Sequence, residues 1–279
     1  MQIKKLIREG IKDEYDIQKL QNVILNIMVA IDEICRKHDI EYYIIGGTAL
    51  GAVRHGGFIP WDDDLDIAMT RSNYDSFCEI CKTESNEDFF FQEGGVDWPI
   101  YFSKVRLKGT YINEFEENVF VEKDKQGIYV DVFPLDNVPN NKLGQLWWYF
   151  CGKALVAYSL YKRGYSTASL GRKMLMACSC PIGIKFIRDF LMHQVTKHNS
   201  HPTKYMGGFS FVSRFDNAFT LSSNWGKPQT IPFETVELMA PADIDGFLRF
   251  YFGDYMQLPP VEKRQGKHFA TVDYGPYND

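Results

Sequence analysis

Isoleucine and leucine recur at steps of three and four residues along the first regular stretch of the chain. The stripe is formed by Ile17, Leu20, Ile24, Ile27, Ile31 and Ile34. That spacing places the side chains on one face of an α-helix. The pattern therefore predicts an amphipathic helix over residues 13–38, capped by Asp13 or Asp16, whose apolar face packs against a sheet.

Shorter apolar runs farther along have the character of strands. One covers residues 42–45, and a second is expected to begin at residues 61–64 and continue through Met69. A helix over residues 71–82, capped through Ser72 or Asn73, follows the second run. Three more strand-like runs follow, at residues 89–92, 100–107 and 127–133. This mixture of helices and strands predicts an α+β fold in which helices flank a mixed sheet.

The second half of the chain changes character twice. Residues 142–199 predict two or three helices, with breaks at Gly164, Gly171 and residues 181–183. The remainder is expected to contain strands and one helix that begins at Asp243. We therefore expect a core over residues 1–141, a helical insertion over 142–199, and a segment over 200–279 that completes the core domain.

Charge is distributed unevenly between these parts. The 279 residues carry a net charge of −5, which argues against a nucleic-acid-binding protein that relies on overall basicity. Residues 142–197 hold nine Lys and Arg side chains and one acid, so this stretch carries +8 and the rest carries −13. Three interpretations stay open: an acceptor-binding lobe, a peripheral contact with an anionic membrane, or a solvated basic helical face.

Localisation and metal content follow from simpler patterns. The first sixteen residues contain charges throughout and resemble no signal peptide, so we expect a cytoplasmic protein, with the inner face of the membrane as an alternative site. The longest apolar stretch begins at Leu146 and is interrupted by Gly152 and Lys153. The six cysteines are expected to be reduced, although Cys78 and Cys81 have the spacing of half a zinc site.

Acidic residues crowd the start of the second predicted strand. In an extended chain, Asp62, Asp64 and Asp66 share one face, because side chains alternate along a strand. Three carboxylates on one face repel one another, and a divalent cation that prefers oxygen ligands relieves this repulsion. The pattern predicts a Mg²⁺ or Mn²⁺ site.

Glycines and cations near these acids suggest that the site binds phosphate. Gly46 and Gly47 follow a strand and precede a helix, an arrangement that lets backbone N–H groups approach an anion. Lys104 and Arg106 alternate along a later strand and are interpreted either as phosphate clamps or as an exposed basic strand face.

One further acid stands in an apolar strand. Asp131 is flanked by Val130 and Val132, and burying a carboxylate is costly unless it is paired or bound to a metal. We interpret Asp131 as a metal ligand or general base. The alternatives are a lone acid at a strand end near Pro134, or Asp136 in its place.

The stretch GGTALGAVRHGGFIPWDDDLDIAM, residues 46–69, resembles the signature of the LicD family of phosphocholine and phospho-sugar-alcohol transferases, related to fukutin-related protein. Residues 236–268 resemble the closing segment of that family. The resemblance implies a nucleotidyltransferase-like fold, with the D-x-D motif on Asp64 and Asp66, a preceding acid on Asp62 and a third acid on Asp131.

The resemblance implies a Mg-dependent phosphotransferase that moves phosphocholine, or a similar phospho-alcohol, from a CDP-linked donor such as CDP-choline to a glycan hydroxyl. The acceptor would belong to a cell-surface polysaccharide such as lipopolysaccharide or teichoic acid, free or lipid-linked. The donor phosphates are expected to contact a set of residues that consists of Gly46, Gly47, Thr48, Arg54, Lys104 and Arg106. If the head group is choline, its quaternary ammonium requires an aromatic wall, for which we select Trp61, Trp98 and Tyr129.

Two other functions remain compatible with the same residues. One is nucleotidyl transfer, in which an NMP group moves from an NTP to a small molecule or sugar phosphate. The other is a glycan- or membrane-associated binding module without activity. The intact acids count against the second alternative.

Overall fold

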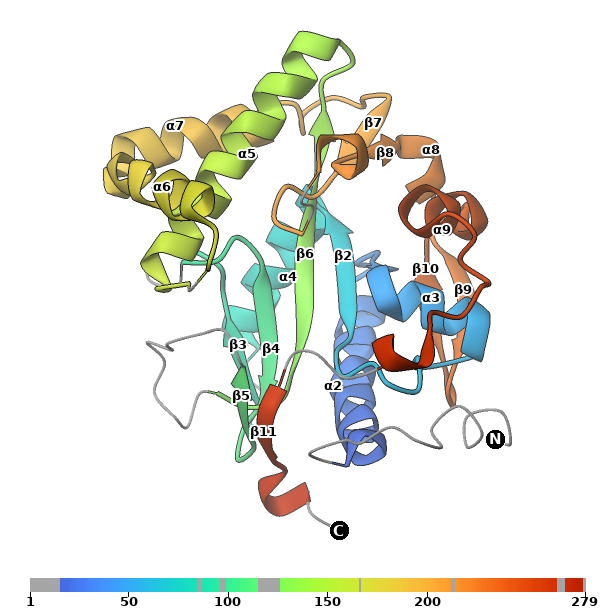
Figure 1. Cartoon of the computed structure of the whole chain (residues 1–279). Helices are drawn as coiled ribbons and strands as arrows, with labels where there is room; N and C mark the ends of the chain where they lie inside the picture. The colour runs from blue at the N-terminus through green and yellow to red at the C-terminus, as the bar shows by residue number, and fades with distance from the viewer. Residues whose placement is uncertain are drawn as a thin grey trace.

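A mixed β-sheet lies at the centre of the protein (Figure 1). The computed structural model describes residues 16–84, 87–95, 99–114, 126–165, 167–211, 214–264 and 269–277. Five strands follow one another across the sheet in the order β1 (Tyr43–Ile44), β2 (Asp66–Thr70), β6 (Tyr129–Val138), β4 (Ser103–Leu107) and β3 (Phe89–Gln92). Strands β2 and β6 are parallel, and the other described pairs of the sheet are antiparallel.

Helix α2 (Ile17–Lys37) confirms the apolar stripe predicted for residues 13–38, and Asp16 caps it by accepting a hydrogen bond from Lys19 N (3.1 Å). The buried stripe packs on β4 and β6. Helix α4 (Arg71–Thr83) lies beside α2, since Lys37 Nζ is 2.8 Å from Glu84 Oε2.

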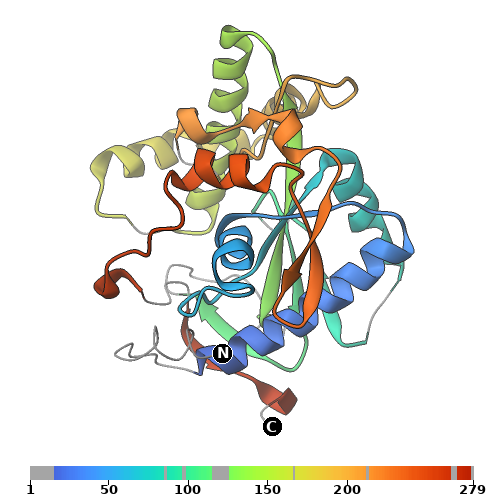
Figure 2. The ribbon, with the colours of Figure 1, turned by 90° about the vertical axis from the view of Figure 1, so that its right-hand side faces the viewer.

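Helix α3 and several C-terminal elements form a group that covers the β1–β2 edge of the sheet. Figure 2 shows this group with α3 in front of the strands. It contains α3 (Gly46–His55), α8 (Ser222–Trp225), the hairpin of β9 (Gln229–Phe233) and β10 (Val236–Ala240), and α9 (Ile244–Phe252). As predicted, α9 begins after Asp243, whose carboxylate accepts a hydrogen bond from Gly246 N. Residues 200–279 therefore contribute to the main hydrophobic core.

The predicted helical insertion forms a lobe at the upper left of Figure 1. It contains α5 (Lys142–Lys162), α6 (Leu170–Cys178), a 3₁₀ turn (Cys180–Gly183) and α7 (Lys185–Thr196). Trp148 donates a hydrogen bond from Nε1 to Val195 O (3.1 Å), which ties α5 to α7. The lobe has its own hydrophobic cluster, which also includes Val138, Phe209 and Ala218. Strands β7 (Tyr205–Gly207) and β8 (Thr220–Leu221) extend the sheet next to it.

Several local expectations are wrong. The second strand begins only at Asp66, because residues 62–65 have no regular secondary structure. Helix α4 is capped by Thr70, one residue before the helix, and neither Ser72 nor Asn73 has that role. Gly171 lies inside α6 and does not break it. Strand β6 continues beyond Pro134, so Asp131 does not lie at the end of a strand.

One pairing was not predicted. Strand β5 (Tyr111–Glu114) pairs antiparallel with β11 (Phe269–Asp273), which brings the C-terminal part of the chain back to the sheet region. Short 3₁₀ turns occupy residues 215–217, 261–263 and 275–277. Among the described residues, no helix has the length and apolar character required to cross a membrane.

Candidate active site

Asp66 and Asp131 lie side by side in the centre of the sheet. Asp66 opens β2 and pairs in register with Asp131 on the parallel neighbour β6. Adjacent strands are about 4.8 Å apart, and residues in register on parallel strands point to the same face. Two acids separated by 65 positions in the sequence therefore project together.

Three consecutive aspartates precede Asp66. Carboxylate oxygens of Asp62, Asp63 and Asp64 lie within 4.8 Å of one another. Burial alternates here: Asp62, Asp64 and Asp66 are partly exposed, whereas Asp63 is 1% exposed. The prediction omitted Asp63, because strict alternation points it away from the others, and the irregular backbone of residues 62–65 brings it into the group.

The aspartate group has the oxygen donors that Mg²⁺ and Mn²⁺ prefer. Among the described residues, Asp62, Asp63 and Asp64 form the group of three Asp, Glu, His or Cys side chains whose ligand atoms lie within 4.8 Å of one another. Cys78 and Cys81 have no third ligand of this kind among the described residues. The site chemistry therefore fits a hard divalent cation.

The N-terminus of α3 faces these acids. The helix begins at Gly46, and Ile45 provides no side-chain cap. A Cβ atom on Gly46 would be 3.5 Å from Asp66 Oδ2, and one on Gly47 would overlap the Asp62 carboxylate. The backbone therefore approaches both acids closely, which only glycine permits at Gly47. Gly46 also has a left-handed φ of +56°.

Thr48, which is predicted to contact the donor phosphates, is buried beside Asp66. It is 3% exposed, and its hydroxyl accepts a hydrogen bond from Asp66 N (2.9 Å). The backbone N of Ile45 also donates to Asp66 O (3.1 Å). These contacts fasten the start of α3 to the start of β2, and so fix the glycine turn relative to Asp66.

Two buried cations, Lys104 and Arg106, lie on β4. Lys104 Nζ lies 3.0 Å from Asp131 Oδ1, and it is 3.4 Å from the centre of the Tyr129 ring. Arg106 donates to Gln92 Oε1 (2.7 Å) and Gly127 O (3.0 Å). Each residue is 4% exposed, so the alternative of an exposed basic strand face is wrong. Lys104 belongs to the acid site, whereas Arg106 is held by acceptors of the protein.

Two arginines lie near Asp62 on another side of the site. Arg54 donates from Nη1 to Tyr255 O (2.9 Å), and burial lowers the pKa of its guanidinium, as does the positive charge of Arg264 nearby, while Asp62 opposes the effect. Arg264 stacks on Trp61, with its guanidinium carbon 5.5 Å from the ring centre. Two like charges held close together favour an anion between or beside them.

Two of the three rings predicted to form an aromatic wall are buried in this structure. Trp61 is 8% exposed and contacts Arg264, and Tyr129 is 7% exposed and contacts Lys104 and Arg106. Trp98 lies outside the described residues. Both described rings therefore already contact cations of the chain.

Part of the sequence matches a known protein family. Residues 39–158 match the family model described as LicD/FKTN/FKRP, nucleotidyltransferase domain. Over these residues, the resemblance to the LicD family predicted from the sequence is confirmed. It is 25% identical over 264 residues to the lipopolysaccharide cholinephosphotransferase LicD of Haemophilus influenzae, which covers 92% of this chain and 97% of that protein.

Two uncharacterized proteins share shorter stretches. One from Rickettsia typhi is 44% identical over 57 residues, which cover 20% of this chain and 18% of that protein. One from Rickettsia prowazekii is 50% identical over 46 residues, which cover 16% of this chain and 17% of that protein.

Residues 58–64 lead into β2 and contain the three consecutive aspartates; they are called the acid loop here. Two residues outside the matched segment hydrogen-bond to the backbone of this loop. Gln21 of α2 donates from Nε2 to Ile59 O (3.0 Å) and Asp62 O (2.8 Å). Glu234, in the β9–β10 turn, accepts from Phe58 N (3.0 Å). Sequence reasoning missed both residues. A glutamine beside the apolar stripe of α2 was the available signal for Gln21, whereas Glu234 offered none.

A second polar region lies at the other end of the sheet. Asp136, the fallback for the third acid, is completely buried and binds Arg71 through two hydrogen bonds of 2.9 Å. Asn199 also donates to Asp136 (2.7 Å). Asp136 lies five residues beyond Asp131 on the same strand, about 16 Å along it. Its position and partners give it a structural role.

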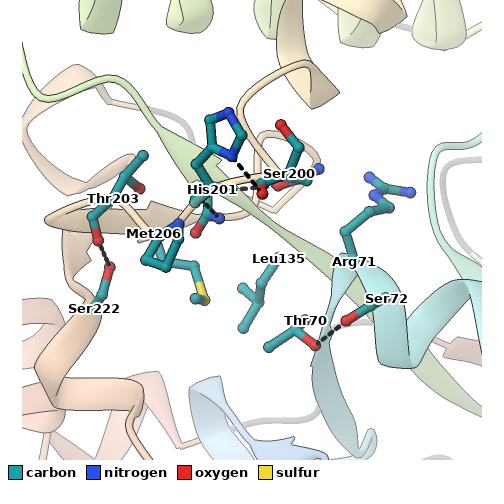
Figure 3. A pocket seen from close by; sticks show the side chains of 12 residues that line it. Thr70, Arg71, Ser72, Leu135, Ser200, His201, Thr203, Met206 and Ser222 are labelled. Atoms are coloured by element: carbon teal, nitrogen blue, oxygen red, sulfur yellow. Dashed lines mark hydrogen bonds between the residues drawn. The ribbon is translucent and has the colours of Figure 1, made fainter.

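A cavity of about 320 Å³ lies beside this ion pair. Figure 3 shows Thr70, Ser72, His201 and Thr203 around it, at the C-terminal ends of β2 and β6. It is therefore separated from Asp66 and Asp131, which lie toward the opposite ends of those strands.

Proposed function

We propose that the protein transfers phosphocholine, or a similar phospho-alcohol, from a CDP-linked donor to a hydroxyl of a cell-surface glycan, and that the reaction depends on Mg²⁺ or Mn²⁺. Two observations carry the proposal: Asp62, Asp63 and Asp64 form one carboxylate group, and Asp66 pairs in register with Asp131. Asp62 and Asp66 both lie against the glycine-lined start of α3. The family match of residues 39–158 and the cholinephosphotransferase name of the Haemophilus influenzae relative support the reaction class.

Asp62, Asp64, Asp66 and Asp131 would hold the metal. Asp63 lies within 4.8 Å of Asp62 and Asp64 and would add its charge to theirs. A bound divalent ion supplies stabilisation of the negative charge that develops on the leaving nucleotide phosphate. These carboxylates also keep the donor phosphates from approaching the site without a counter-ion.

The acceptor hydroxyl would be oriented at Asp131. A general base must lie within hydrogen-bond reach of the proton that it accepts, and Asp131 is partly exposed at the face where Asp66 projects. Lys104 fixes the Asp131 carboxylate from the β4 side at 3.0 Å. The contact with Lys104 would therefore orient the Asp131 carboxylate before the substrate binds.

The donor phosphates would lie between α3 and the arginine pair. The first N–H groups of α3 point out of an uncapped helix N-terminus, which attracts anions. Arg54, which lies near both Asp62 and Arg264, would neutralise phosphate oxygens together with Arg264. With Trp61 and Tyr129 covered, the structure offers no assigned wall for a quaternary ammonium among its described residues.

The test is turnover of CDP-choline with Mg²⁺ in Asp64→Asn and Asp66→Asn. Each variant should lose at least about 100-fold in kcat, the scale expected when a preorganised charge at the reacting centre is removed. The melting temperature should stay equal or rise, because a repulsive charge is removed. Glu33→Gln, which changes an exposed acid on α2, is the matched control. Wild-type turnover in either aspartate variant would remove the metal assignment.

Nucleotidyl transfer is the second candidate, favoured by the family description of residues 39–158 as a nucleotidyltransferase domain. The same acids serve both reactions, since the two differ in which phosphorus is attacked. Release of CMP from CDP-choline indicates head-group transfer. Release of pyrophosphate from an NTP indicates nucleotidyl transfer.

A further inference from the structure

The helical lobe exposes an unusual number of large apolar side chains. Helix α6 has no buried residue over Leu170–Cys178. The exposed apolar side chains of the three helices and the turn before α7 are Leu143, Leu146, Trp147, Phe150, Tyr161, Leu170, Met174, Leu175, Ile184, Phe186 and Phe190. Scattered single residues of this kind are normal on protein surfaces, but concentrations mark interaction sites.

Exposed side chains of α5 and α7 meet at Trp147 and Gln194. On α7, Phe186, Phe190 and Gln194 are spaced by four and so lie on one line of the helix. Trp147 Nε1 of α5 donates to Gln194 Oε1 (3.2 Å), and the Trp147 and Phe150 rings stack with centroids 5.8 Å apart. The aromatic residues of both helices therefore form one surface, while Trp148, Leu191 and Val195 form the buried side.

Positive charge accompanies the apolar side chains. Residues 142–197 carry nine Lys and Arg side chains against the single acid Asp189, whereas the rest of the chain carries −13. Asp189 pairs with Lys185 on α7. On α6, the exposed Arg172 and Lys173 follow Leu170 and precede Met174. Exposed aromatic and aliphatic residues next to cations are the composition of helices that lie in the interface of an anionic bilayer.

We propose that the exposed apolar and basic side chains of α5, α6 and α7, here called the lobe surface, bind an anionic phospholipid membrane. Charge complementarity selects this occupant: a +8 segment in an otherwise acidic protein is attracted to a negative lipid surface. The same charge opposes pairing of the lobe surface with a second copy of itself. Apolar insertion and cation attraction act together, so the interaction should need both.

The experiment is co-sedimentation of the full chain with vesicles of phosphatidylcholine alone and with vesicles that also contain phosphatidylglycerol. We expect binding to the phosphatidylglycerol vesicles at low salt, weak binding to phosphatidylcholine, and loss of binding as salt is raised. Equal binding to both compositions, or no binding to either, would overturn the proposal.

Two variants separate the contributions of apolar contact and charge. Phe186→Ser with Leu175→Ser changes side chains that are 79% and 59% exposed, and Arg172→Glu with Lys173→Glu reverses two exposed charges. Each pair of substitutions should weaken vesicle binding at least about tenfold, because apolar contact and charge attraction each contribute a factor to the binding constant. The matched controls Met256→Ser (57% exposed) and Lys227→Glu lie outside the lobe and should bind as wild type.

Turnover on a water-soluble acceptor and the melting temperature should be unchanged in these variants, since none of them touches the acid site. Size-exclusion chromatography tests the competing occupant. A wild-type dimer that Phe186→Ser converts to a monomer, with vesicle binding unaffected, would assign the lobe surface to self-association and overturn the membrane proposal.

Discussion

Lys104 Nζ lies 3.0 Å from Asp131 Oδ1, across the antiparallel pair of β4 and β6. Both side chains are mostly buried, at 6% and 14% exposed. Removing one partner of a buried pair is more damaging than removing both, because a charge then remains in a poorly solvated position. The pair therefore couples the stability of the sheet to the orientation of an acid in the proposed reaction.

Lys104→Met should lower the free energy of unfolding by about 3 kcal/mol and reduce turnover at least tenfold. Adding Asp131→Asn should recover much of the stability and none of the activity. Urea denaturation of both single variants and the double variant measures the coupling. Additive losses in stability would show that the two side chains act independently.

Asp136 should matter for stability alone. Its buried carboxylate binds Arg71 through two hydrogen bonds at the far end of β6, so Asp136→Asn is expected to cost about 3–5 kcal/mol. The kcat of the folded fraction should match wild type. Asp75→Asn is the control: Asp75 is 63% exposed and 3.8 Å from Arg71, and its loss should cost under about 1 kcal/mol. A kcat defect in folded Asp136→Asn would assign it to the reaction.

Gly47→Ala should affect metal dependence more than stability. The new Cβ would overlap the Asp62 carboxylate, which must then move away from the other acids. We expect the Mg²⁺ concentration for half-maximal turnover to rise about tenfold, the scale seen when metal ligands are displaced by their surroundings. Gly171→Ala, in open space on α6, should instead add about 0.5–1 kcal/mol of stability and leave the Mg²⁺ titration unchanged.

Arg264 should act in donor binding. Its guanidinium stacks on Trp61, and its charge reaches Arg54 beside Asp62. Arg264→Ala is expected to raise KM for CDP-choline about tenfold with a smaller change in kcat, since phosphate neutralisation is present in the ground state. Arg264→Lys should recover part of this loss, because lysine keeps the charge but not the planar stack. The neighbouring Lys263→Ala serves as control, and an unchanged KM in Arg264→Ala would contradict the assignment.

Buried thiols should make the protein sensitive to alkali. Burial raises the pKa of Cys78 to about 11 and that of Cys81 to about 12, from an ordinary value of 9.0. Above pH 9.0, the folded state retains thiol protons that the unfolded state releases. The contribution of the two protonated thiols to the free energy of unfolding is therefore complete below pH 9.0 and declines as the pH rises toward their pKa values in the folded state. Melting temperatures measured across this range should fall.

The same thiols predict a labelling pattern. The thiolate is the reactive form, so at about pH 8 iodoacetamide should modify the exposed Cys178 and Cys180 and spare Cys78 and Cys81. Peptide mass spectrometry reads the sites. Early modification of Cys78 in folded protein would contradict the burial of this helix face.

Local patterns determined a large part of this fold. The apolar stripe of α2, the cap of α9 at Asp243 and the strand at residues 89–92 follow from spacing that neighbouring residues alone impose. The acids at 62, 64 and 66 were found in the same way, because a dense acidic run beside a double glycine is readable without knowledge of the fold. The LicD resemblance also lies in this continuous stretch.

The sequence by itself therefore determined most of the helices and strands, the resemblance to a family and the run of aspartates. Only the tertiary structure decided that Asp131 pairs in register with Asp66, that Lys104 binds Asp131, and that Gln21 and Glu234 hold the acid loop. The physical reason is range. Helical stripes and caps depend on residues a few positions apart, whereas these contacts join strands and turns whose order and register are set by packing the whole core.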